Sequence, residues 1–140
     1  MVDGGGEMIT NGDITIYNRE YNSQTRLDVW HRTVIKNVWQ HADNKVAQTD
    51  SGLKSSDAFK IRIPKASPDK PYLDPESYAA VTNKDKYWTI QEDDIVVLSA
   101  CKQDISKPSD LKEKHIRYVK IVSWSNNDVG SQPHWRIGGI

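Results

Sequence analysis

The chain has 140 residues, of which 36% are hydrophobic, and it holds five tryptophans and six tyrosines. Its 19 basic and 19 acidic residues give a formal net charge of +0. This balance argues against a protein whose main function is to bind the phosphate backbone of nucleic acid. The single cysteine, Cys101, excludes a disulfide scaffold and fits folding in the cytosol. This length predicts one domain with a compact, aromatic-rich core.

The first residues are expected to lie outside that core. Residues 1–12 are rich in glycine and polar side chains, which predicts a flexible N-terminal arm, followed by a single β-rich domain over 13–140. Residues 1–7 lack the basic and apolar regions of a signal peptide, and no apolar run approaches the roughly 18–20 residues of a membrane span. We therefore expect no membrane contact.

The stretch 28–41 predicts the longest strand, because it is dense in β-branched and aromatic residues. Both of its faces are half apolar. Either the strand is covered by its own sheet on one side and by a neighbouring element on the other, or a bulge exchanges its two faces midway. Residues 18–26 read as a polar connection, and Asp43-Asn44 as a turn that pairs 34–40 with 45–49. Alternating or apolar runs predict further strands at 13–17, 58–64, 87–90, 95–100, 116–124 and 134–138.

Two short helices interrupt this pattern. Asp74 as N-cap, with Pro75 at the first helical position, predicts a helix to Val81 inside the inserted segment 65–86. A second helix is expected over 106–114. The fold class is therefore mainly β, a small β-barrel or sandwich with one or two short inserted helices.

Candidate catalytic and metal sites are weak. Asp93 and Asp94 read as a solvated turn, since adjacent carboxylates on a strand-like segment point to opposite sides. Phosphate-binding glycine loops are absent from the sequence, and none of the histidines has metal-ligand spacing: His31, His41, His115 and His134. We expect no enzyme activity, no metal and no cofactor.

Basic and aromatic residues interleave at 117–120 and 134–136. Such strands could stack single-stranded nucleic acid on Tyr118 and Trp135, but a half-buried strand face is the favoured interpretation at zero net charge.

Several segments together carry a resemblance to a known group of proteins. Residues 30–39 (WHRTVIKNVW) precede Gly52-Leu53, the strand 59–64 (FKIRIP), Tyr72, and Trp88 leading to 93–97 (DDIVV). The chain closes with 121–127 and 134–139. This order resembles small structural proteins of the head-to-tail region of tailed bacteriophages and prophages. The resemblance implies a head completion or stopper protein, a β-barrel subunit of a ring that gates the DNA channel.

The resemblance also implies the partners and the location. These are a homo-oligomeric ring of roughly six or twelve copies, the portal or adaptor, tail proteins, and transient non-specific contact with double-stranded DNA. The location is the virion neck, assembled in the bacterial host cytoplasm. Contact or channel-loop candidates come from 51–57 and 65–86: Gly52, Leu53, Lys54, Tyr72, Leu73, Tyr78, Lys84 and Lys86.

Two alternatives remain open. The inserted helix and the extra C-terminal strands depart from the compact head-completion pattern, so a tail completion or minor capsid protein of the same region also fits. From another class, a small β-barrel that binds nucleic acid or a peptide fits the composition.

Overall fold

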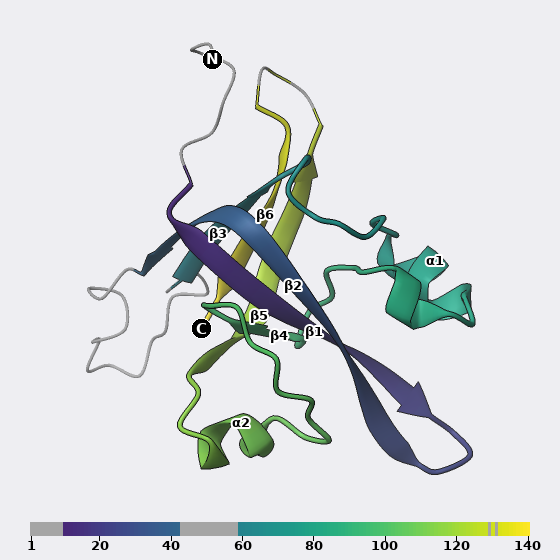
Figure 1. The fold of residues 1–140 in the computed structure, drawn as a ribbon. Helices are drawn as coiled ribbons and strands as arrows, with labels where there is room; N and C mark the ends of the chain where they lie inside the picture. The colour runs from purple at the N-terminus through teal and green to yellow at the C-terminus, as the bar shows by residue number, and fades with distance from the viewer. Residues whose placement is uncertain (1–9, 43–58, 129, 131) are drawn as a thin grey trace, which may run out of the picture.

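A computed structural model describes residues 10–42, 59–128, 130 and 132–140 of the chain (Figure 1). Six antiparallel strands form a sheet that closes on itself in the order β1-β2-β3-β6-β5-β4. The predicted mainly β fold with two short helices is confirmed. The elements are β1 (Gly12–Asn22), β2 (Leu27–Ala42), β3 (Phe59–Pro64), α1 (Pro75–Ala80), the 3-10 turn η2 (Lys84–Lys86), β4 (Ile95–Val97), α2 (Ser109–Glu113), β5 (Tyr118–Asn127) and β6 (His134–Gly139).

β2 is the longest strand, as its β-branched content predicts, and it contains a bulge, one of the two alternatives that its half-apolar faces allowed. Its pairing with β1 shifts register between Gly12↔Val38 and Ile14↔Ile35. Asn37 adopts φ 61° there, and its amide donates to an Asp13 carboxylate oxygen at 3.1 Å. The bulge brings Ile35 and Val38 to the same interior although they lie three positions apart, which explains the half-apolar faces.

The closed sheet encloses the main core. Isoleucines and valines from all six strands line it, and an aromatic trio from separate segments closes one side. Trp88 lies 5.0 Å from Tyr72 and 4.9 Å from Trp135 between ring centroids. The predicted strand 87–90 is therefore buried, but it forms only one isolated bridge, Tyr72↔Trp88, and is not a strand. It is held by the packing of its side chains, by main-chain hydrogen bonds of Trp88 with Pro71 and Leu73, and by the Asn18 side chain, without a regular ladder.

β4 separates this core from a second one. It spans three residues, fewer than the 95–100 predicted, but it is buried on both faces as expected. Val96 points into the main core, while Ile95 and Val97 join Tyr17 and Leu111 in a cluster beneath α2. A strand covered on both sides needs no polar alternation, which accounts for its continuous apolar sequence.

The predicted helices are both present. Asp74 caps α1 by accepting a hydrogen bond from the Ser77 amide at 2.7 Å, and Pro75 opens the helix. This hydrogen bond lowers the pKa of the Asp74 carboxyl. α2 is shorter than the range 106–114 predicted for it.

Three other expectations need correction or fall outside the described residues. β1 runs to Asn22, so 18–22 is strand and not polar connection. β5 runs to Asn127, past the Trp124 predicted as its end. The predicted partner 45–49 lies outside the described residues, and the described partner of the end of β2 is β3.

The residues predicted as an N-terminal arm also fall largely outside the described part, which begins at residue 10. Asn11 already joins the barrel, since its amide donates to the Val38 carbonyl at 2.9 Å.

The bulge gives the first testable prediction. A β-branched residue at position 37 pays the steric cost of positive φ, so Asn37→Val should lower the free energy of unfolding by about 1–2 kcal/mol. Asn37→Gly should change it little, because glycine adopts this conformation freely. Both variants keep the amide that Asp13 accepts from, which makes them a matched pair in urea denaturation. Equal losses in both would contradict the left-handed bulge.

Candidate functional site

The most distinctive surface is a two-stranded ribbon that continues beyond the barrel. β1 pairs with β4 only over Thr15–Tyr17, whereas its pairing with β2 continues from Asn18↔His31 to Asn22↔Leu27. We call residues 18–31 the distal ribbon. Figure 1 shows it extending away from the barrel toward the lower right.

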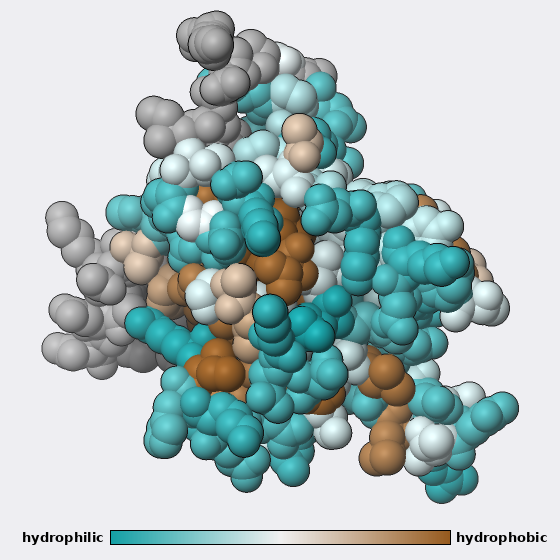
Figure 2. All heavy atoms as spheres, viewed as in Figure 1, coloured by the Kyte–Doolittle hydropathy of each residue, from teal (hydrophilic) through white to brown (hydrophobic). Residues whose placement is uncertain are grey.

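Exposed apolar side chains flank the polar turn 23–26 at the tip of the distal ribbon. Tyr21 is 60%, Leu27 67% and Val29 38% exposed. Apolar surface is visible at the lower right of Figure 2, where the ribbon lies. A two-stranded hairpin is marginally stable in water on its own, so the exposed apolar side chains near its tip form a candidate contact surface.

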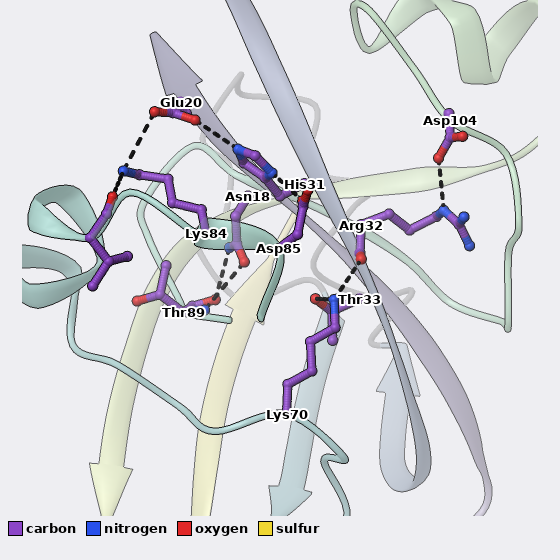
Figure 3. Close-up of polar contacts among 11 residues, drawn as sticks. Asn18, Glu20, His31, Arg32, Thr33, Lys70, Lys84, Asp85, Thr89 and Asp104 are labelled. Carbon is purple, nitrogen blue, oxygen red and sulfur yellow. Dashed lines mark hydrogen bonds and ion pairs between the residues drawn. The ribbon is translucent and has the colours of Figure 1, made fainter. Parts of the chain in front are cut away.

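The base of the ribbon is anchored by a buried carboxylate, Asp94, which is 2% exposed. It accepts hydrogen bonds from Asn18 Nδ2 at 2.9 Å, Gln91 Nε2 at 2.8 Å and the Arg19 amide at 3.2 Å. Asn18 also exchanges two hydrogen bonds with the Thr89 main chain (Figure 3). Burial raises the pKa of Asp94 to about 6, although the three donors act in the opposite direction.

A second polar group holds the ribbon from the outside (Figure 3). His31 Nε2 lies 2.8 Å from Glu20 Oε1, and its Nδ1 lies 2.6 Å from Asp85 Oδ1. Lys84 Nζ approaches Glu20 Oε2 at 3.4 Å and donates to the Val81 carbonyl at 2.6 Å. The hydrogen bond from His31 lowers the pKa of the Glu20 carboxyl. The segment 65–86 is thereby tied to the ribbon.

The opposite edge of the ribbon base is tied to the same segment. Lys70 Nζ donates to the Arg32 carbonyl at 3.3 Å and lies 3.4 Å from Thr33 Oγ1. Burial lowers the pKa of Lys70. Arg32 in turn pairs with Asp104 at 3.2 Å (Figure 3), which connects the ribbon base to the segment before α2.

The structure distributes the contact candidates over two environments. Tyr78 and Lys84 are buried, and Tyr72 packs in the aromatic trio, so these side chains stabilise the subunit itself. Leu73 is half-buried and Lys86 is exposed, and these two keep surface for a partner. The remaining candidates lie outside the described residues: Gly52, Leu53 and Lys54.

A hollow of about 210 Å³ lies between the ribbon and α1. Its lining mixes charges of both signs with aromatic rings: Arg19, Glu20, Tyr21, Tyr78, Ala79, Lys84 and Gln91. Among the described residues, no three His, Cys, Asp or Glu side chains are grouped to hold a metal ion. The chemistry available in this hollow is ion pairing and hydrogen bonding.

The strands considered for nucleic-acid stacking present little aromatic surface. Trp135 is 6% exposed and packs inside the trio, while Lys65 Nζ covers its ring at 4.0 Å. Tyr118 is half-buried against the second core. A stacking platform needs exposed rings, so the burial of Trp135 weakens that interpretation.

A family model matches residues 9–140, which includes every described strand and helix. The chain belongs to DUF6751. This is a family of unknown function. No curated protein and no solved structure matches the chain. In the described residues, no helix is both long and apolar enough to cross a membrane.

Sequence reasoning missed both anchors of the distal ribbon. The acidic run at 92–94 resembles a solvated turn, and only Asp94 of it is buried. The positive φ of Asp93, 72°, turns the chain so that Asp94 faces inward. The available signal was the polar, strand-length segment Asn18–Asn22 following an alternating run, which suits a strand that continues beyond a core.

The buried carboxylate predicts a specific pH dependence. The pKa of Asp94 is raised from 3.8 to about 6, so the folded state binds a proton more tightly than the unfolded state. The stability from this proton is fully present below pH 3.8 and is lost as the pH rises through 6. Between pH 7 and pH 4, the wild-type free energy of unfolding should therefore rise relative to Asp94→Asn by about 2 kcal/mol.

Denaturant titrations of both proteins at several pH values measure this difference. Asp93→Asn is the matched control, because Asp93 is exposed and asparagine tolerates its positive φ. It should follow the wild type at every pH. If the difference in free energy of unfolding between the wild type and Asp94→Asn stays constant from pH 7 to pH 4, a buried, proton-binding Asp94 is ruled out.

Proposed function

We propose that the chain is a structural, non-enzymatic subunit of the neck of a tailed bacteriophage. In this role, of the head completion or stopper type, it forms a ring between the portal or adaptor and the tail. The support from sequence is the order of segments from 30–39 to 134–139 that resembles such proteins.

The observation that carries the proposal is the distal ribbon. Its base is held by hydrogen bonds of Asp94 and His31, while Tyr21 and Leu27 are exposed near its tip. A projection with exposed apolar side chains beside its end turn suits a subunit that works by contacting neighbours. Rings form when one such heterologous contact repeats until it closes.

The segment 65–86 has a place in this proposal as the second contact element. It lies against the ribbon base through Asp85 and Lys70, and it carries the exposed Lys86. A portal, adaptor or tail protein that binds this segment would act on the same polar contacts that orient the ribbon. Binding of either neighbour in the neck would then affect the orientation of the ribbon and so the contact between ring subunits.

The charge balance is compatible with a channel that DNA passes through. The net charge of +0 leaves no strong field to hold phosphate groups, so DNA contacts would be transient and non-specific. In the proposed stopper role, a loop narrows the channel by its position and not by tight binding.

The experiment is a measurement of mass in solution, first for the purified protein and then with the connector from the genome that encodes it. We expect a closed ring, or a monomer that becomes a ring on the connector. A monomer at every concentration that also fails to bind the connector would overturn the proposal. Assembly onto isolated tails and not onto connector-bearing capsids would move the protein to tail completion.

A further inference from the structure

The tip of the distal ribbon has an arrangement that a flat partner surface cannot cover. Paired residues of an antiparallel ribbon share a face, so Tyr21 lies on one face with Asp28, and Leu27 lies on the other with Asn22. Val29 pairs with Glu20 and shares the face of Leu27. Because apolar side chains occupy both faces, burial of all three requires insertion into a hollow or between two elements.

Both edges of the ribbon are also open near its tip. Arg19 directs its amide to Asp94 and its carbonyl to Gln91, away from β2. The alternation of the main chain places the amide and carbonyl of Tyr21 on the same outer edge. No described strand pairs with either edge over residues 18–31. The tip therefore offers main-chain groups as well as apolar side chains to a partner.

A second exposed surface lies on the β5–β6 hairpin. Trp124 is 36% exposed there, and with Ser123, Ser125 and Arg136 it lines a hollow of about 280 Å³. Figure 1 shows the β5–β6 hairpin at the top of the barrel, at the end opposite the ribbon tip. The exposed large hydrophobic side chains within described strands thus fall into two patches at opposite ends.

The two patches carry complementary charges. Asp28 lies beside Tyr21, on the ribbon face opposite Leu27 and Val29, and it makes no ion pair with another described residue. Arg136 borders the hollow, is exposed, and likewise has no carboxylate partner within the described ranges. Arg62 pairs directly across from Arg136, so a second positive charge adds to the attraction for a carboxylate.

From these observations we propose that the ribbon tip of one copy inserts into the Trp124 hollow of a second copy, with Asp28 paired to Arg136. The two patches lie too far apart within one chain to meet, and they differ from each other, so the contact is head-to-tail and repeats around a ring. This inference rests on the proposed function in that it specifies the contact between ring subunits. The occupant of the hollow is another copy of this chain.

Cysteine cross-linking tests the contact directly. Leu27→Cys is mixed with Ser125→Cys under mild oxidation, and disulfide-linked dimers are measured on a non-reducing gel. We expect them only in the mixture, because in either variant alone the thiol on one patch would meet a partner patch that carries no thiol. Lys36→Cys, exposed on β2 outside the tip, replaces Leu27→Cys as control. The native Cys101 is buried at 7% exposure and should give no background.

A charge exchange tests the pairing. Asp28→Arg and Arg136→Asp should each weaken self-association by about tenfold or more, and the double variant should restore it. Each single variant should keep the folded spectrum of the wild type, since Arg136 is exposed and Asp28 is only half-buried. Self-association that is unchanged by either reversal, with cross-linking no stronger than the control, would overturn this inference.

The outcomes separate the two proposals. A wild-type ring without the specific cross-link would refute the ribbon contact and leave the neck proposal standing. Specific cross-links in a protein that ignores the connector would support the contact and count against the neck. A monomer under both conditions, without cross-links, would refute both.

Discussion

The direction of the distal ribbon depends on the buried carboxylate of Asp94. β1 leaves its barrel partner β4 after Tyr17, and a two-stranded ribbon has no sheet of its own to fix its course. Asp94 supplies the missing constraint by accepting hydrogen bonds from Asn18 and the Arg19 amide. A buried carboxylate destabilises the fold unless its oxygens accept hydrogen bonds. Asp94 and its three donors, from Asn18, Arg19 and Gln91, must therefore be present together.

This anchor joins elements that are distant in sequence. Asp94 and Gln91 come from the turn before β4, and Asn18 and Thr89 link that turn to β1. Because β4 divides the two cores, a displacement at its start would disturb both. The ribbon is therefore connected to the interior through a short polar network.

Elements of the fold were predictable from the sequence where they depend on nearby residues, and not where they depend on contacts between distant segments. The strand at 59–64 and the capped helix after Asp74 follow from local patterns, because alternation and capping act within a few residues. The burial of Tyr78 and Lys84 depends on the ribbon packing beside them, and no local pattern encodes that. The same holds for Trp88, which is buried and extended but has only an isolated bridge, since rings from two other segments hold it.

The ribbon length was missed for a related reason. Residues 18–22 lack apolar alternation because a strand that has left the barrel no longer has one inner face. The bulge at Asn37, in contrast, was foreseeable as one of two alternatives, since the faces of β2 exchange character midway and asparagine tolerates positive φ.

An apolar ribbon with open edges would ordinarily invite indiscriminate pairing between strands. Natural sheets avoid this with short edges and charged side chains, and here Glu20, Arg26 and Asp28 lie among the exposed apolar residues of the tip. These charges weaken apolar contacts with any surface that lacks matching groups. Asp28 and Leu27 lie on opposite faces of the ribbon, so insertion of the tip would pair Asp28 with Arg136 on one face and bury Leu27 on the other. The proposed contact therefore combines apolar burial with charge selection. The apolar side chains of the tip thus promote association, and its charges restrict that association to a partner surface with matching charges.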